Sequence, residues 1–464
     1  MPQHALRELI RFAGLAGPQA GQIQITGDDP VFPTPYRIAA CGAAAIAAAA
    51  YAAAELWRLR AGRRQPLSVD ARAAAAALRS NRYLQVDGST PHGPRDPLSG
   101  FFPVREGRWI SIHCNFPHHR DAALRVLGAM PEREAAMRAS AGWDGLELED
   151  AIHAAGGCAG LARSASEWAQ HPQHTAVAAQ PLLEILRIGD APPEPLPPGA
   201  RPLAGVRVLD LTRVLAGPTC ARTLAEHGAG VLKISGPHLP DSGAYELDTG
   251  IGKRAAQLDL RAARDAATLR RLAASADVFS QSYRPGALAG HGFAPEDLAR
   301  TRPGIVCVSL SAWGGSGPWR DRRGFDTIVQ TVSGMALASG DGAQPKYLPV
   351  SAIDYVSGYL MALGTMAALA RRAEEGGSWL VRVSLARTGR WIADQGRIDA
   401  GALLGVPEDL AEEEIARLTM ETGSPQGRIR HLRPVALLAE TPARWTRPPV
   451  PLGHDRAVWD ESGA

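Results

Sequence analysis

A regular pattern of apolar positions lies between residues 355 and 372. Apolar residues recur there at steps of four, four, three and four, the spacing of one face of an α-helix: Tyr355, Tyr359, Leu363, Met366 and Ala370. Two arginines and then two glycines end the pattern, as is typical of a helix C-terminus. We predict a helix here with Asp354 as its N-cap. Capping alone, worth about 1 kcal/mol, would be enough to explain an aspartate at that position.

The same order of features occurs near the start of the chain. An alanine-rich helical stretch from Tyr36, a basic turn with glycine and an apolar segment that ends at Asp70 follow one another. Val69 aligns with Val383, so paired residue numbers differ by 314. We interpret this similarity as an internal duplication. Ala40 then takes the place of Asp354, and the first copy lacks the acid.

Strand-like and helix-like segments alternate after residue 203. Apolar runs at 206–211 and 231–234 flank a helical pattern at 219–227, which is the order of a βαβ unit in a parallel sheet. The predicted class is α/β, with a Rossmann-like, doubly wound parallel sheet. The first strand-to-helix loop has no Gly-x-Gly-x-x-Gly motif, which disfavours pyridine-dinucleotide chemistry.

Changes in composition suggest five parts of the chain. A proline-dense stretch forms a linker at 191–202. We assign 1–80 to a degenerate first copy, 81–190 to a small α+β domain, 203–396 to the sheet domain, and 397–464 to a C-terminal helix with an extended tail.

Composition excludes several classes of function. The net charge of +3 is too small to indicate nucleic-acid binding. The five cysteines lie far apart without a Cys-x-x-Cys pair, which favours reduced thiols and a cytoplasmic protein without a zinc site.

The uncharged stretch 38–54 is nearly all alanine and too short to cross a membrane. The histidines near 113–119 and 171–174 have no carboxylate or cysteine at ligand spacing, so we expect solvated or capping histidines and no metal.

Several motifs in order resemble the class III coenzyme A transferases of CaiB/BaiF type, the family of formyl-CoA and carnitine CoA-transferases. They are the segments 203–212, 216–218, 228–234, 253–260, 276–278, 284–286, 309–318 and the stretch around Asp354. The region 107–173 resembles the small domain of the family, which in the family follows the sheet domain and here precedes it. The resemblance therefore implies a fused or permuted arrangement.

The resemblance implies that Asp354 is the catalytic nucleophile. It places coenzyme A binding in strand-end loops at Leu215, Ala216, Leu258, Asp259, Arg261, Ser282, Tyr283, Arg284, Arg323 and Asp326. Tyr283 is expected to stack on adenine and the arginines to meet phosphates. Gly236 and Gly290 stand where formyl-CoA transferase has arginines that hold CoA.

The implied reaction transfers CoA from an acyl-CoA to a carboxylic acid through an aspartyl intermediate, with the carboxylate held ionised at the helix start. Acyl-CoA is then a substrate, no cofactor is permanently bound, and a cytoplasmic homodimer without nucleic-acid or membrane partners is expected. One alternative is an α-methylacyl-CoA racemase, which has a Gly-His-Asp motif where this chain has Gly324-Phe325-Asp326. Another is a degenerate, non-catalytic CoA-binding or structural homologue.

Overall fold

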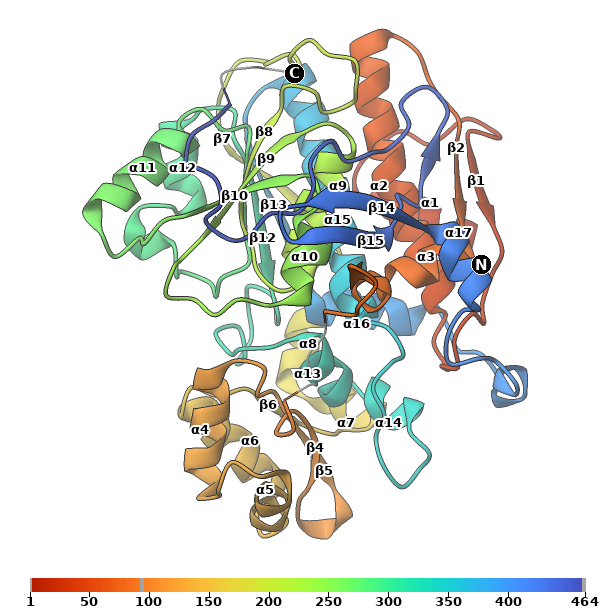
Figure 1. The fold of residues 1–464 in the computed structure, drawn as a ribbon, viewed down its shortest axis with the longest axis vertical. Helices are drawn as coiled ribbons and strands as arrows, with labels where there is room; N and C mark the ends of the chain where they lie inside the picture. Colours follow the sequence, from red (N-terminus) through yellow and green to blue (C-terminus); the bar gives the residue numbers. More distant parts are fainter. Residues whose placement is uncertain (1, 92–95, 461–464) are drawn as a thin grey trace.

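A seven-stranded sheet lies at the centre of the computed structural model, which describes residues 2–91 and 96–460 (Figure 1). The strand order is β10-β9-β8-β11-β12-β13-β7. Six neighbouring strands are parallel, and only β7 runs antiparallel, against β13. The strands are β7 (Glu184–Gly189), β8 (Arg207–Leu211), β9 (Gly230–Ser235), β10 (Lys253–Gln257), β11 (Val278–Gln281), β12 (Val306–Ser311) and β13 (Ser378–Ser384). Numbered from β8, the parallel strands have the order 3-2-1-4-5-6 of a doubly wound sheet, so the predicted α/β class is confirmed.

Helices cover both faces of this sheet. On one face, α9 (Ala216–Glu226) and α15 (Ala352–Glu375) share one apolar core with the first-copy helix α2 (Ile38–Ala61). On the other face, α11 (Ala263–Ala273) and α12 (Pro295–Thr301) form a second core. The remaining helices of the sheet region are α10 (Ala244–Gly250), α13 (Asp326–Val332), α14 (Met335–Ser339), α16 (Leu385–Asp394) and the 3₁₀ turn Ala289–His291.

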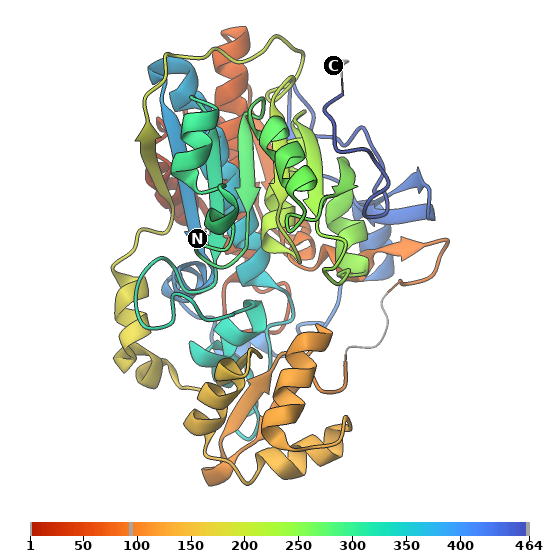
Figure 2. The same cartoon turned by 90° about the vertical axis from the view of Figure 1, so that its left-hand side faces the viewer.

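A smaller α+β unit with its own apolar core lies at one end of the main sheet (Figures 1 and 2). Its antiparallel sheet has the order β4-β5-β6. The unit consists of β4 (Gly100–Pro103), β5 (Trp109–Ile112), β6 (Ala159–Leu161), α4 (Pro117–Leu127), α5 (Arg133–Ser140), α6 (Gly145–Ala154) and the 3₁₀ turn Arg105–Gly107. Two further helices, α7 (Ala165–Gln170) and α8 (Pro172–Ala178), lead from it to β7.

The two ends of the chain contain elements that the sequence pattern did not reveal. They include α1 (Pro2–Phe12) and β1 (Ile23–Thr26) at the start, and β14 (Thr419–Ser424), β15 (Gly427–Leu432) and β16 (Leu437–Leu438) in the region expected to be a helix and an extended tail. The predicted C-terminal helix is the short α17 (Glu412–Leu418), next to the 3₁₀ turn Ala400–Leu403. A short alternating run such as Ile23–Thr26 is hard to recognise because it spans only two side-chain periods.

The predicted duplication is visible in the positions of the elements. Helices α2 and α15 each have 24 residues, and both of their ends differ by 314 in residue number. The same shift relates β2 (Leu67–Asp70) to the last four residues of β13, and the start of α3 (Ala71–Ala77) to the start of α16. The 3₁₀ turn Ser80–Tyr83 and β3 (Gln85–Val86) follow α3. We call the segment 2–190 copy one and the segment 203–460 copy two.

Contacts to both copies hold the linker between them. From copy one, the Arg60 guanidinium donates to the carbonyl oxygen of Pro202 at 3.3 Å and also binds the Pro197 carbonyl. From copy two, Arg302 donates to the Glu194 carboxylate at 2.6 Å. The proline-rich segment is thus fixed at both of its ends.

Within residues 2–91 and 96–460, two helices, α2 and α15, are long and apolar enough to cross a membrane by length and composition. In both, the most apolar stretch is entirely buried inside the protein. Core helices pass the same test, so these two helices give little support to a membrane span.

Close packing of α15 against α9 depends on Gly358. A methyl group on Gly358 would clash with the carbonyl oxygen of Ala216 and lie 2.7 Å from Thr219 Cβ. We expect Gly358→Ala to lower the free energy of unfolding by about 1–3 kcal/mol, because two buried helices would have to separate. Gly290→Ala is a matched control, since no atom lies within 4 Å of the added methyl group. Equal thermal unfolding midpoints for the two variants would contradict this account of the helix contact.

Candidate active site

The sequence-predicted site residues occupy loops at one edge of the main sheet. The loop after β8 carries Leu215 and Ala216, and the loop after β11 carries Ser282, Tyr283 and Arg284. The loop after β10 carries 258–261, and the loop after β12 ends at Arg323 before α13 begins at Asp326. Because these strands are parallel, their carboxyl ends meet at the same edge, where doubly wound proteins bind ligands.

Asp354 lies inside the first turn of α15 and is not its N-cap. The helix begins at Ala352, three residues earlier than the expected start, and its N-cap is Ser351. The Asp354 backbone N–H donates to Asp326 Oδ2 at 3.0 Å. Since a carboxylate from another element caps this turn, the Asp354 side chain is not needed for capping. The predicted capping role was therefore wrong, and the Asp354 carboxylate is left available for chemistry.

Asp326 is itself held by a glutamine one turn further along α13. The Gln330 side-chain amide donates to Asp326 Oδ1, and Gln330 Oε1 accepts the Leu348 backbone N–H at 2.8 Å. This chain of bonds ties α13 to the segment that leads into α15. It fixes the position of the helix start that carries Asp354.

The environment of Asp354 opposes ionisation. The residue is only 7% exposed, and burial, followed by the charge of Asp326, raises its pKa well above the usual range. Among the described residues, no side chain donates a hydrogen bond to the Asp354 carboxylate. The raised pKa runs against the expectation that the helix start holds this carboxylate ionised. Loss of hydration and like-charge repulsion outweigh the helix dipole here.

The start of α9 lies beside the start of α15. Leu215 is the N-cap of α9, and both Leu215 and Ala216 are 3% exposed. Gly358, one turn after Asp354, touches the Ala216 carbonyl, so the predicted pair does lie near the nucleophile candidate. Val214, just before them, has φ +69. Left-handed backbone is strained for a β-branched residue, and such strain is concentrated at functional sites; the sequence pattern gave no sign of it.

Positive charge gathers at this edge of the sheet. Arg284 contributes to a lowered pKa of Arg323, after the larger effect of burial. Arg323 and Arg213 together contribute to a lowered pKa of His118, again after burial. Arg213 was not among the predicted residues; its backbone N–H donates to Ser282 Oγ at 3.2 Å, which joins two of the predicted loops. The four cationic or titratable groups form a region suited to an anion.

The remaining predicted residues lie at the strand end after β10 or in the apolar core. Arg261 is exposed and forms a bidentate ion pair with Asp259, at 2.8 and 2.7 Å. This bond lowers the pKa of Asp259 to about 2. Leu258 is buried. Tyr283 packs against the core between α11, α12 and the sheet, which fits a packed aromatic side chain at least as well as a ring that stacks on adenine.

The small α+β unit supplies a wall of aromatic rings next to Asp326. The His113 ring stacks on Phe325, with centroids 3.8 Å apart and planes within 2°. His119 lies edge-on to Phe325, and burial lowers its pKa to about 3. Both histidines are buried, contrary to the expected solvated histidines, whereas His171 does cap α8 by accepting the Gln173 N–H at 3.1 Å. Phe325 occupies the position where a racemase would have its histidine.

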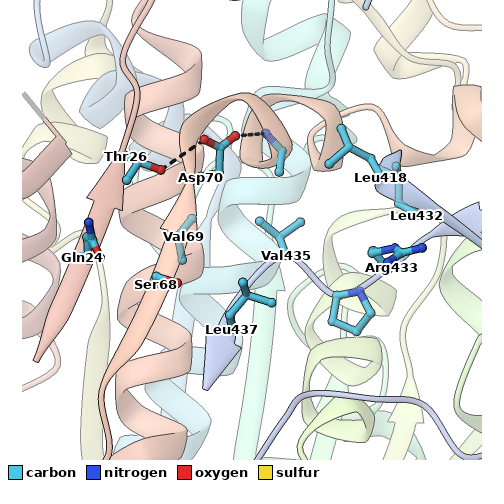
Figure 3. Close-up of a pocket in the computed structure, with 12 residues that line it drawn as sticks. Gln24, Thr26, Ser68, Val69, Asp70, Leu418, Leu432, Arg433, Val435 and Leu437 are labelled. Carbon is cyan, nitrogen blue, oxygen red and sulfur yellow. Dashed lines mark hydrogen bonds between the residues drawn. The ribbon is translucent and has the colours of Figure 1, made fainter. Parts of the chain in front are cut away.

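The described part of the chain contains two cavities of note. One of about 320 Å³ lies between β1 and β2 of copy one and the segment 432–437 of copy two, and none of the predicted site residues lines it (Figure 3). Another of about 70 Å³ is lined by Arg284 and Gln281 beside the predicted loop 282–284. No group of three or more metal-ligating side chains occurs among residues 2–91 and 96–460.

Fold and site together define an α/β protein with a buried carboxylate at the carboxyl edge of a doubly wound sheet. Residues 203–420 match the family model for CoA-transferase family III. Over this segment the chain is similar to CoA-transferase family III.

Similar proteins include an acetyl-coenzyme A transferase of Hypoxylon pulicicidum, 37% identical over 210 residues, which cover 44% of this chain and 35% of the relative. The succinate–glutarate CoA-transferase of Agrobacterium fabrum is 34% identical over 196 residues, covering 38% and 49%. A solved CAIB/BAIF family protein of Brucella suis is 28% identical, with TM-score 0.40 and coverage of 42% and 57%. The chain spans about a third to a half of the length of the curated relatives it matches.

The raised pKa of Asp354 has a consequence for stability. Between the usual aspartate pKa of about 4 and the raised value, the folded state holds a proton that the unfolded state releases, so stability falls as pH rises. Asp354→Asn keeps a neutral side chain at all pH values. We expect its thermal midpoint to exceed that of the wild type by at least about 2 °C at pH 8, with the difference shrinking toward pH 4. An asparagine variant that is less stable than the wild type at pH 8 would contradict the assigned environment.

Proposed function

We propose that the protein transfers coenzyme A from an acyl-CoA thioester to a carboxylic acid, with Asp354 as the nucleophile. The single observation that carries this proposal is a buried carboxylate, freed from capping, at the ligand-binding edge of a CoA-transferase family III segment. Acyl-CoA is a substrate in this proposal and not a resident cofactor. The relatives named above act on acetyl-CoA, succinate and glutarate by name, which supports a small carboxylic acid as the acceptor class.

The proposed reaction begins when an Asp354 oxygen attacks the thioester carbonyl carbon. A C–O bond forms, the C–S bond breaks, and CoA leaves as a thiolate, giving a mixed anhydride on Asp354. The thiolate then attacks the aspartyl carbonyl carbon, which releases the first acid and leaves an aspartyl-CoA thioester. The acceptor carboxylate then attacks the aspartyl-CoA carbonyl carbon and expels the CoA thiolate, which gives a second mixed anhydride. The thiolate attacks the acyl carbon that came from the acceptor, so that a new acyl-CoA departs and the Asp354 carboxylate is restored.

The environment of Asp354 suits this chemistry in two respects. A desolvated carboxylate with a raised pKa is a stronger nucleophile once it is ionised, since basicity and nucleophilicity rise together. Fixation of the helix start by Asp326 and Gln330 removes motion that the reaction would otherwise have to restrict. Asp326 therefore acts as a positioning residue in this proposal.

The cationic region supports a role in binding the phosphates of CoA. After the larger effect of burial, Arg284 contributes to the lowered pKa of Arg323, and Arg323 and Arg213 contribute to the lowered pKa of His118, so these cationic side chains lie near one another. Arg284 is exposed, and Arg323 is half-buried, so both can reach a ligand. Arg261 is a weaker candidate, because its guanidinium is already paired with Asp259.

Neither alternative gains support from the site. Two-base racemisation needs a second base beside the thioester, and Phe325 cannot serve as one. A non-catalytic CoA-binding homologue would have no need of a desolvated carboxylate, which costs stability when it is ionised. The following experiments separate these alternatives.

Replacement of Asp354 tests the nucleophile directly. We expect Asp354→Ala to lower turnover by on the order of 10³-fold or more, because the covalent step is lost. Wild-type protein incubated with a panel of acyl-CoAs should show an acyl or CoA adduct on the peptide that contains residue 354, detected by mass spectrometry. Full activity in the alanine variant would remove Asp354 from the mechanism. CoA binding without turnover of any acyl pair in the wild type would favour the non-catalytic alternative.

Replacement of Asp326 tests the electrostatic coupling. Asp326→Asn keeps an oxygen able to accept the Asp354 N–H but removes the neighbouring charge, so the pKa of Asp354 should fall. The acidic limb of the kcat/KM profile should then move to lower pH, with a loss of rate of about tenfold from the less basic nucleophile.

Asp29→Asn is the matched control, because Asp29 caps α2 as Asp326 caps α15. This variant should leave the pH profile in place. A profile that moves equally in both variants would show that the shift is not a property of the Asp326–Asp354 pair.

A further inference from the structure

The C-terminal strands of the two copies are exchanged. β7, which ends copy one, pairs antiparallel with β13 of copy two, and β16, near the end of copy two, pairs antiparallel with β2 of copy one (Figure 2 shows β7 at the edge of the main sheet). The two pairings have the same register. Glu184 of β7 lies opposite Arg382, and Leu437 of β16 lies opposite Ser68. Ser68 and Arg382 are equivalent positions in the two copies, because their numbers differ by 314.

Each copy lacks a part that the other has retained. Strand β1 lies beside β2 in copy one as residues 308–311 of β12 lie beside the last four residues of β13 in copy two. The register of the two strand pairs is the same. From there to the long helix, copy one has only residues 27–37, whereas copy two has 312–351 with α13 and α14. After the following strand and helix, copy one has the whole small α+β unit before β7, whereas copy two has only 395–436 before β16. Neither copy is a complete sheet-plus-small-domain unit by itself.

The long helices of the two copies lie side by side in the core (Figure 1). Every residue of α15 from Ala352 to Ala370 is buried, and so is every residue of α2 from Ile38 to Leu56. Since α9 and the sheet cover one side of α15, its other side depends on α2. Without copy one, this apolar surface would face water, and a surface of that kind normally requires a partner.

Copy one has kept the helix cap of the site but not its nucleophile. The Ala39 and Ala40 N–H groups donate to Asp29 Oδ1 and Oδ2, at 2.9 Å each. Ala40 is the counterpart of Asp354, so Asp29 binds the same backbone position that Asp326 binds in copy two. Both Asp29 oxygens are occupied by the helix start, which leaves copy one without a free carboxylate at this place.

Copy one nevertheless contributes to the site of copy two. The Tyr355 hydroxyl, next to Asp354, lies 3.1 Å from Asn81 Oδ1 and accepts a hydrogen bond from Ser80 Oγ at 3.1 Å. Ser80 and Asn81 belong to copy one. The aromatic wall at Phe325 also comes from the small unit of copy one. Copy one thus contacts Tyr355 and Phe325, the chain neighbours of Asp354 and Asp326.

The cavity beside β2 is a further trace of this asymmetry (Figure 3). Three of its lining residues are Ser68 and Ala73 of β2 and α3 and Leu437 of the exchanged strand β16. At the matching positions around β13, longer charged side chains stand: Arg382, Arg387 and, on the exchanged strand β7, Glu184. Arg382 of copy two and Glu184 of copy one form an ion pair at 3.2 Å. The hollow beside β2 therefore follows from shorter side chains at matching positions.

We infer that the protein works as a monomer in which copy one is a built-in, non-catalytic partner of copy two. The pair that a homodimer would form is closed inside one chain, and it has one site, at Asp354. Among the described residues, the exposed large apolar side chains are scattered over several elements, such as Met130, Leu186 and Leu404, and offer no obvious second interface. The identity of the site rests on the proposed function, whereas the monomeric architecture does not.

The intact chain with a specific protease site inserted between Pro198 and Gly199, in the exposed part of the linker, tests this inference. Light scattering should give the monomer mass of 49.1 kDa for the wild type and about the same for the uncut variant. After cleavage, the two fragments should remain in one particle of unchanged mass, with turnover retained and one adduct per particle. A stable particle of twice that mass, or separation of the fragments without denaturant, would overturn the inference.

A pair of variants in β16 shows whether strand exchange holds the fragments together. Leu438 is 3% exposed and pairs with Leu67, whereas its neighbour Leu437 is 67% exposed. In the cleaved protein, Leu438→Asp should make the fragments separate at a lower urea concentration, and Leu437→Asp should not. Equal behaviour of the two variants would show that β16 does not join the copies. Mass and fragment retention need no catalysis, so an inactive protein would disprove the proposed reaction and still test the architecture.

Discussion

Close contact among three helices governs the rest of this structure. α15 lies between α9 and α2, and backbone-level contact at Gly358 lets α15 approach the start of α9. Alanine along α2 has the same effect on the other side, since small side chains allow two helix axes to come close. Because α15 carries Asp354 at its start, this packing also determines where the carboxylate lies relative to the strand-end loops. Fold and site thus depend on one set of small residues.

Such packing makes the placement of a carboxylate expensive. Asp354 enters a region with little water and with Asp326 as its neighbour, and both effects favour the protonated acid. Proteins tolerate a group of this kind where its reactivity is useful, at the expense of stability. Asp29 shows the other outcome in the same molecule. Its carboxylate is bound by two backbone N–H groups and acts as an ordinary helix cap, although burial still raises its pKa to about 6.

The sequence predicted most of the main sheet and the identity of the candidate nucleophile, but not the surroundings of the nucleophile. Buried parallel strands are continuous apolar runs, so β8, β9 and β12 could be recognised locally. The start of α15 was misjudged because its cap comes from Asp326, in a different helix, and no local pattern reveals such a partner. The pairing of β7 with β13 joins segments that are almost two hundred residues apart in the chain. Long-range contacts of this kind are invisible to periodicity. Arg213 and the strained Val214 were missed because their significance depends on loops that meet only in the folded protein.

The linker gives the duplicated architecture a consequence beyond geometry. Held by Arg60 on one side and Arg302 on the other, it keeps the two copies at a fixed one-to-one ratio and at a very high effective concentration. A part that is missing from one copy can therefore be supplied by the other copy in the same molecule. Under these conditions the two halves are free to decay in complementary ways. Copy one has neither the acid nor counterparts of α13 and α14, copy two has no small α+β unit after α16, and each segment is covered by the other within one chain.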